Sequence, residues 1–193
     1  MKSIIIKITL FPFLLVLFVL YLAFAETKIF IDADAYFKRG VANVNLGKYD
    51  EAISDFNKAI ELNPKSAWPY HNRGNAYDNL GKHDEAIVDY SKAIELNPKY
   101  AIAYYNRGIV YANLGKHDEA ISDYSKAIEL NPKDAQTYYN RACIYSISNQ
   151  QKNAINDLST AIRINPNIKN EARTDKDFNN MRNTPEFKKL IGE

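Results

Sequence analysis

Few side chains in this sequence are placed to do chemistry. His83 and His117 occupy equivalent positions in two closely similar stretches of the chain, and Cys143 is the only cysteine. Histidine binds zinc at about 2 Å, whereas packed helices lie about 8–10 Å apart, so histidines on successive helices cannot share an ion. Cys143 has no histidine placed as its base, and the glycines occur singly rather than in a phosphate-binding loop. The sequence therefore predicts no catalytic residue, no metal site and no cofactor.

The charge is balanced along the body of the chain. Lys2 and Lys7 are the only charged side chains before residue 26, and without them the 25 Lys and Arg residues fall to 23, equal to the 23 Asp and Glu residues. A neutral body gives no electrostatic basis for binding a phosphate backbone. We therefore expect no nucleic-acid partner.

The N-terminal segment has the layout of an export signal. Two lysines precede an unbroken uncharged run from Ile8 to Ala25, which contains Pro12 and ends in the small-x-small pattern Ala23-Phe24-Ala25. This layout is typical of a signal peptide cleaved after residue 25. An uncleaved membrane anchor is the alternative, since the run is at the lower limit for spanning a bilayer. Either way we expect an exported, periplasmic or extracellular protein, which meets the membrane only through residues 1–25 if they are retained.

The rest of the chain is built from an internal repeat. Tyr70–Pro98 and Tyr104–Pro132 differ at five of 29 positions, and weaker copies flank them at the same offset, beginning at Tyr36 and Tyr138. The chain thus divides into a signal peptide or anchor over 1–25, a lead-in over 26–32, repeats over 33–66, 67–100, 101–134 and 135–168, and a C-terminal segment over 169–193.

Each repeat reads as two helices. Tyr70, Gly74 and Tyr77 are spaced i, i+4, i+7, which places them on one helical face. Gly81 is suited to the left-handed conformation that ends a helix, and Asp84 is suited to cap the next one. In the C-terminal segment, Thr184-Pro185 predicts a further helix start, with Thr as N-cap and Pro at the first helical position. We expect this segment to cover the apolar flank of the fourth repeat.

These units resemble tetratricopeptide repeats, a family of helix-turn-helix units that recur with this period. The family's marker positions recur four times in phase, most plainly at position 8 (Gly40, Gly74, Gly108, Ala142), position 20 (Ala52, Ala86, Ala120, Ala154), position 24 (Phe56, Tyr90, Tyr124, Leu158) and position 32 (Pro64, Pro98, Pro132, Pro166). The end units depart from the pattern at Asn43, Ala142, Ser148 and Asn149. The resemblance implies an all-α, right-handed superhelical solenoid with a C-terminal capping helix segment.

An arginine and an aspartate recur at a fixed spacing in every repeat. Position 7 is Arg and position 23 is Asp, giving the pairs Arg39/Asp55, Arg73/Asp89, Arg107/Asp123 and Arg141/Asp157. We expect each pair to form an ion pair between the two helices of its repeat. Two independent solvated charges are the alternative, and an exposed pair would contribute little.

The resemblance also implies where a partner would bind. In the family, positions 2, 5, 9, 12 and 13 of the first helix face a concave groove. Independently, the differences His71/Tyr105, Asn75/Ile109 and Asp78/Ala112 between the two most similar repeats share one helical face. The predicted groove is aromatic, apolar and amide-bearing, and it comprises Phe37, Val41, Trp68, His71, Asn75, Tyr105, Ile109, Asn113, Tyr139 and Cys143.

The groove chemistry favours a binding module over an enzyme. Trp and Tyr dominate binding energy at interfaces, Asn side chains can bond a ligand backbone, and an extended peptide or amphipathic helix would suit the groove. Some family members bind a C-terminal carboxylate through groove lysines, but position 5 here is Phe37, His71, Tyr105 and Tyr139. We therefore expect an exported, non-enzymatic adaptor with a protein or peptide partner. A self-associating or membrane-tethered scaffold of the cell envelope is the alternative.

Overall fold

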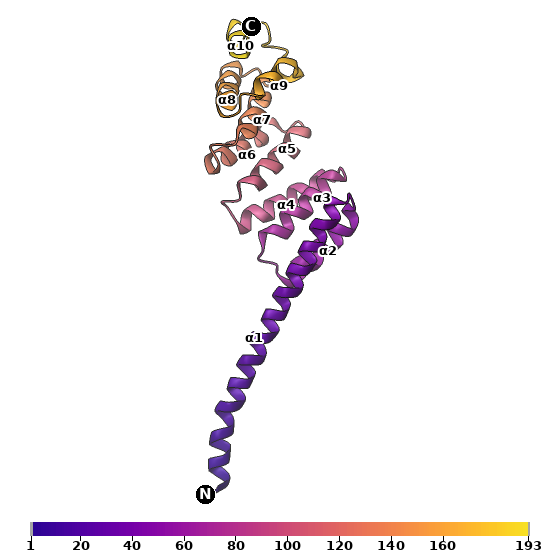
Figure 1. Cartoon of the computed structure of the whole chain (residues 1–193), viewed down its shortest axis with the longest axis vertical. Coiled ribbons are helices and arrows are strands. Elements are labelled where there is room, and N and C mark those ends of the chain that lie inside the picture. The colour runs from indigo at the N-terminus through magenta and orange to yellow at the C-terminus, as the bar shows by residue number, and fades with distance from the viewer. Residues whose placement is uncertain (1, 193) are drawn as a thin grey trace.

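The computed structural model describes the backbone of residues 2–192, and the side chains of residues 18–22, 24, 27–28 and 31–192. Within these residues the chain is helical, with consecutive helices packed in pairs and the pairs stacked into a solenoid (Figure 1). The pairs are α1 (Lys2–Asn45) with α2 (Tyr49–Leu62), α3 (Ala67–Asn79) with α4 (His83–Leu96), α5 (Ala101–Asn113) with α6 (His117–Leu130), and α7 (Ala135–Ile147) with α8 (Gln151–Ile164). The C-terminal segment adds α9 (Ile168–Thr174), the 3-10 helix η1 (Lys176–Phe178) and α10 (Pro185–Ile191). The predicted all-α solenoid with a C-terminal cap is confirmed.

The first helix is much longer than its equivalents. α1 runs without a break through the predicted lead-in, and its N-terminal part projects beyond the solenoid (Figure 1). Most side chains of the predicted export segment, residues 1–25, lie outside the described set. Among the described residues, no helix combines the length and apolar character needed to cross a membrane. Export and cleavage therefore stay predictions.

The turn inside each repeat depends on a left-handed residue. Gly81 adopts φ 72°, as predicted, and Asn149 holds the equivalent position in the fourth repeat with φ 58°. Asparagine tolerates this region better than most residues, which explains the substitution. The predicted cap Asp84 is wrong: Lys82 occupies the N-cap and α4 begins at His83. Asp84 lies in the first turn, where the helix dipole favours an acidic side chain.

A glycine on the first helix makes room for an aromatic ring on the second. A Cβ on Gly108 would lie 2.8 Å from the Tyr124 ring, and one on Gly74 would lie 2.9 Å from the Tyr90 ring. The fourth repeat has alanine at this position and pairs it with Leu158 instead of a ring. The two positions therefore change together, as close packing requires.

The arginine at position 7 and the aspartate at position 23 form the predicted ion pair in all four repeats. Arg107 donates from Nε and Nη2 to the two carboxylate oxygens of Asp123, each at 2.8 Å, and the aspartate side chain is only 7% exposed. The guanidinium also lies 5.8 Å from the ring centroids of Tyr104 and Tyr111. The pair is thus largely buried and bidentate, a stronger arrangement than an exposed ion pair.

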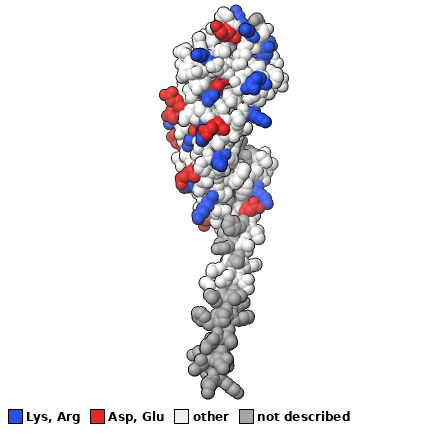
Figure 2. Space-filling model, turned by 90° about the vertical axis from the view of Figure 1, so that its left-hand side faces the viewer, with Lys and Arg blue, Asp and Glu red and all other residues white. Residues whose placement is uncertain are grey.

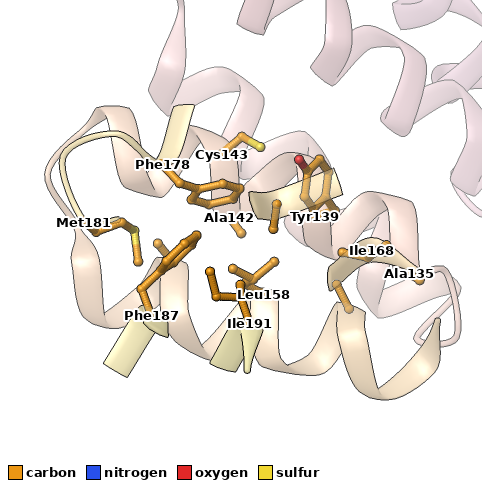
Figure 3. Packing of buried hydrophobic residues seen from close by; sticks show 13 residues of the cluster. Ala135, Tyr139, Ala142, Cys143, Leu158, Ile168, Phe178, Met181, Phe187 and Ile191 are labelled. Carbon is orange, nitrogen blue, oxygen red and sulfur yellow. The ribbon is translucent and has the colours of Figure 1, made fainter. Parts of the chain in front are cut away.

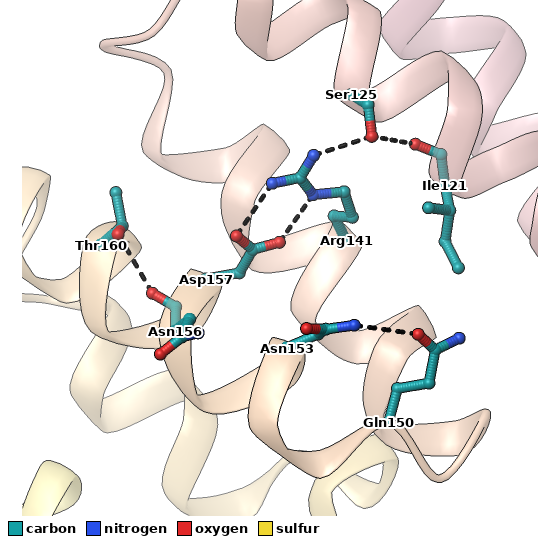
Figure 4. A network of polar contacts seen from close by, with 8 residues as sticks. All are labelled: Ile121, Ser125, Arg141, Gln150, Asn153, Asn156, Asp157 and Thr160. Atoms are coloured by element: carbon teal, nitrogen blue, oxygen red, sulfur yellow. Dashed lines mark hydrogen bonds and ion pairs between the residues drawn. The ribbon is translucent and has the colours of Figure 1, made fainter.

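Each arginine after the first also reaches the preceding repeat. Arg107 Nη1 donates to Ser91 Oγ at 2.7 Å, and Arg141 Nη1 donates to Ser125 Oγ at 2.8 Å (Figure 4). Arg73 contacts Asn57 in the same way. One side chain thereby ties together three helices: its own, its partner within the repeat, and the second helix of the repeat before.

The C-terminal segment closes the apolar end of the solenoid. Phe178, Met181, Phe187 and Ile191 are buried together against Leu158 of α8 (Figure 3). Thr184 caps α10 by accepting a hydrogen bond from the Phe187 N–H at 3.3 Å, with Pro185 next to it, as the sequence predicts.

We expect strong coupling between Arg107 and Asp123 in a double-mutant cycle. Replacing either residue by alanine leaves the other buried and unpaired, which costs about 3–5 kcal/mol. The double variant should lose less than the sum, with a coupling energy of about 1–3 kcal/mol, measured by urea unfolding. The Arg39/Asp55 pair is the internal control: Arg39 is 65% exposed, so its coupling should be smaller. Equal or zero coupling at both pairs would contradict the buried-pair interpretation.

We also expect Gly108→Ala to destabilise the chain although alanine is the better helix former. The gain in helix propensity is about 1 kcal/mol, whereas overpacking costs about 1–3 kcal/mol. Adding Tyr124→Leu, which reproduces the Ala142/Leu158 pair of the fourth repeat, should relieve the clash. The measurement is the urea midpoint of both single variants and the double variant. Additive losses would show that the ring does not oppose this glycine.

Candidate peptide-binding groove

The predicted groove residues lie on the first helices of the four repeats, and hydrogen bonds join those helices side by side. Asn106 Nδ2 lies 3.1 Å from His71 Nε2 and donates to Asn75 Oδ1 at 2.9 Å. Asn140 donates to the Tyr105 hydroxyl at 3.2 Å. The groove face is therefore continuous from the second repeat to the fourth.

The burial of the predicted residues divides them into three sets. Trp68 and Asn113 are exposed; Phe37, Val41, Asn75, Tyr105 and Ile109 are half-buried; and His71, Tyr139 and Cys143 are buried. A partner can thus reach the predicted residues of the first three repeats except His71, whereas the fourth repeat offers none of its predicted pair.

Tyr139 and Cys143 are covered by the C-terminal segment instead of lining an open groove. The Tyr139 hydroxyl donates to the Asp175 carboxylate, and the Tyr139 and Phe178 ring centroids lie 5.8 Å apart. The segment was expected to cover only the apolar flank, but η1 also packs against α7. The fourth repeat is closed on this face because of that path.

Cys143 lies beside two carboxylates in this covered region. Its Sγ and oxygens of Asp175 and Asp177 are within 4.8 Å of one another, and the thiol donates to Asp175 at 3.7 Å. Burial raises the pKa of the Cys143 thiol far above its usual range, with the neighbouring Asp175 charge adding to the effect. These groups form a hydrogen-bonded contact between α7 and the C-terminal segment.

The amides of the groove bond to one another. Asn75 Oδ1 accepts from the Tyr90 hydroxyl at 2.7 Å as well as from Asn106. Sequence reasoning missed Asn106 and Asn140, although asparagine recurs at this position in three repeats. Asn75 was expected to be free to bond a ligand backbone, but its oxygen is already used within the protein.

Two of the hollows along the accessible part of the groove are each lined by two predicted residues. The larger, about 440 Å³, lies between the first and second repeats and is lined by Ala33, Asp34, Phe37, Ala59, Asn63, Ser66, Trp68 and Pro69. The other, about 280 Å³, is lined by Val44, Asn75, Asp78, Asn79, Tyr90, Asn106 and Ile109. The predicted residues Phe37, Trp68, Asn75 and Ile109 are thus brought to two concave sites.

Charged side chains of both signs lie on the described surface. Acidic and basic residues are interspersed over the face of the solenoid shown in Figure 2. In the described linings of these two hollows the acidic side chains are Asp34 and Asp78, and no basic side chain is present. Recognition of a strongly acidic ligand has no support in these linings.

Family models match the chain over most of the repeat region. A model described as TPR repeat matches residues 44–81 and 74–115, and two described as tetratricopeptide repeat match residues 101–134 and 124–156. The chain belongs to the tetratricopeptide repeat family. No curated protein matches its sequence.

Solved structures agree with this assignment. A crystal structure of MamA superposes with a TM-score of 0.68 at 28% identity, covering 75% of this chain and 86% of MamA. MamA from Desulfovibrio magneticus RS-1, residues 41 to the end, gives a TM-score of 0.71 at 20% identity, covering 83% of this chain and 94% of that one. The first TPR of Spaghetti (RPAP3), bound to the HSP90 peptide SRMEEVD, gives 0.58 at 32% identity, covering 60% and 91%. These structures share the stacked helical pairs.

We expect the free energy of unfolding of the chain to fall in acid, because His71 is buried in the groove face in its neutral form. Burial lowers the pKa of His71 from 6.5 to about 4, so the unfolded chain binds a proton at a pH where the folded chain does not. The stability contributed by the neutral ring is therefore lost as the pH falls from about 6.5 toward 4. His71→Phe, which copies Phe37 of the first repeat, removes this titration. Between pH 7 and pH 5 the free energy of unfolding of the native chain should fall by about 1–2 kcal/mol more than that of the variant. Parallel pH profiles in urea would contradict the assigned burial.

Proposed function

We propose that this chain is a non-enzymatic adaptor that binds a segment of a partner protein along the first helices of repeats one to three. The observation that carries the proposal is the pair of hollows on that face, both bordered by accessible aromatic and apolar side chains. Phe37 and Trp68 border one hollow and Ile109 the other. Aromatic residues beside concave sites are the residue types that dominate binding energy.

A related structure supports a peptide as the ligand. The first TPR of Spaghetti is bound to the peptide SRMEEVD, and it is 32% identical over 60% of this chain. Position 5 here is Phe37, His71 or Tyr105 in the accessible repeats, so no lysine is present there to attract a terminal carboxylate. Burial of apolar side chains is the recognition that these linings favour.

The internal bonding of the amides supports the same mode. Asn75 Oδ1 accepts from Tyr90 and Asn106, so this oxygen is not available to a ligand backbone. Affinity would then come from side chains of the partner entering the hollows, where about 25 cal/mol is gained for each Å² of apolar surface buried.

A second candidate function is a tethered or self-associating scaffold. It is favoured by the projecting part of α1, where Phe18, Tyr21 and Phe24 are 58%, 68% and 70% exposed. Contiguous exposed apolar side chains mark surfaces that meet another protein or a membrane. The sequence of residues 1–25 favours an exported location for either function.

The peptide-binding role is tested by selecting displayed random peptides on the full chain and measuring their dissociation constants by fluorescence anisotropy. Ile109→Asn places in the third repeat the residue that the second repeat has at this position, so the fold should be kept. We expect it to weaken binding about tenfold, equivalent to about 1.4 kcal/mol. Val88→Asn is the matched control, because Val88 is 67% exposed on α4, outside the groove lining.

Equal weakening by both variants, or by neither, would count against the groove. Gel filtration separates the second candidate. Concentration-dependent size in a chain that binds no peptide would favour the scaffold.

A further inference from the structure

Equivalent positions frame each of the three junctions between repeats and the junction of the fourth repeat with the C-terminal segment, but the space that they enclose is open at some junctions and filled at others. At the first junction it is lined by Ala33, Ala59, Ser66 and Pro69. One repeat later, the equivalent positions at the second junction form a buried cluster of Ala67, Ala93, Tyr100 and Ala103. The two sets differ chiefly at the last residue of the repeat, which is serine in one and tyrosine in the other.

Tyr100 fills the hollow that Ser66 leaves open. Tyr100 is only 8% exposed, and its ring centroid lies 4.9 Å from that of His71 and 5.0 Å from that of Trp68. At the first junction, the equivalents of these two neighbours are Phe37 and Asp34, and both line the 440 Å³ hollow. The chain thus displays in its own second junction how an aromatic ring occupies this site.

At the third and fourth junctions the alanines that line the site are kept, whereas the residue at the last position of the repeat, which we call the filler, varies. At the third, Asp134 takes the place of Tyr100 and the hollow is about 140 Å³. At the fourth, Ile168 takes that place and is 2% exposed, packed with Ala135 and Ala161. The first junction is therefore the one with the smallest filler and the largest open volume among those described.

We propose that the hollow at the first junction anchors one aromatic side chain, phenylalanine or tyrosine, of the partner protein. This anchor rests on the proposed function, since it names what the partner segment must carry. The guest ring takes the place that Tyr100 takes at the second junction, against Phe37. Trp68 forms the opposite wall, and the Tyr100 ring packs against Trp68. Because its walls are held by packing, the site is preformed and needs little ordering to bind.

One charged residue borders the hollow. Asp34 is the only charged residue in the described lining, and its side chain is 57% exposed and paired with Lys38 at 2.6 Å. Because Lys38 already balances this carboxylate, the lining imposes no requirement for a charged residue beside the guest ring.

Ser66→Tyr tests the proposal with the protein's own filler. Ser66 makes no side-chain cap bond at the start of α3, and its φ of −82° is close to the −83° of Tyr100, whereas its ψ is 122° against 77°. We expect the new ring to enter the hollow after an adjustment of ψ and to leave the thermal midpoint unchanged or higher. Ser122→Tyr is the matched control, because Ser122 is exposed on α6.

The first readout needs no partner. Trp68 is the only tryptophan, so its indole N–H gives one NMR cross-peak that reports on this wall. Titrating the full chain with p-cresol, the side chain of tyrosine, should shift that peak in the native chain and in Ser122→Tyr but not in Ser66→Tyr. Isoamyl alcohol, an aliphatic probe, should bind more weakly. Equal shifts in all three proteins, or a stronger response to the aliphatic probe, would overturn the proposal.

The second readout uses the peptides selected on the native chain. They should share an aromatic residue, and replacing that aromatic by alanine, or using Ser66→Tyr as receptor, should raise the dissociation constant at least tenfold. Peptides that bind Ser66→Tyr as tightly as the native chain would overturn the anchor and leave the groove function standing. If no peptide binds while p-cresol still distinguishes Ser66→Tyr, the pocket is supported and the proposed function fails. Should Ser66→Tyr not fold, Tyr100→Ser provides the converse test: p-cresol should raise its thermal midpoint more than that of Ser122→Tyr, because Tyr100→Ser has two open hollows and Ser122→Tyr has only the first. Equal rises in the two variants would overturn the proposal.

Discussion

The buried pairing of arginine with aspartate is the constraint on which the rest of the solenoid depends. A carboxylate as enclosed as that of Asp123 is tolerated only when it is paired and hydrogen-bonded. The arginine that satisfies it comes from the first helix, and its third nitrogen reaches the repeat before. The rotation of two helices and the spacing of two repeats are therefore fixed by one side chain.

That constraint decides which residues face a partner. With the arginine turned toward the second helix and flanked by two tyrosine rings, positions 5 and 9 of the same helix are presented on the groove side. The groove can then vary from repeat to repeat without disturbing the packing. The first repeat is the loosest case, since Arg39 is 65% exposed and Asn43, which donates to Asp55 at 3.0 Å, replaces the second tyrosine. No described repeat lies before it to supply the missing contact.

Sequence reasoning predicted what is local or repeated. The four ion pairs, the left-handed Gly81 and the Thr184 cap follow from spacing and residue type alone. It did not predict that Tyr139 and Cys143 are covered, because the path of the C-terminal segment depends on long-range packing of Phe178 and its neighbours. Nor did it predict the fillers at the junctions. The last position of each repeat lies at the boundary with the next, and its role becomes visible only when the walls around it are in place.

The junction hollows link stability to recognition through the same apolar surface. Burial of a large apolar side chain contributes about 1.5–3 kcal/mol to folding, and Tyr100 contributes less than this because its hydroxyl is buried without a hydrogen-bond partner among the described residues. At the first junction Ser66 cannot make that contribution, so the alanine floor and the walls of Phe37 and Trp68 stay available to a side chain from outside. The free energy that would have stabilised the fold is instead gained on binding. In a repeat protein whose packing residues recur, specificity can therefore arise from a small residue at one junction, such as Ser66, as much as from the side chains that vary along the groove.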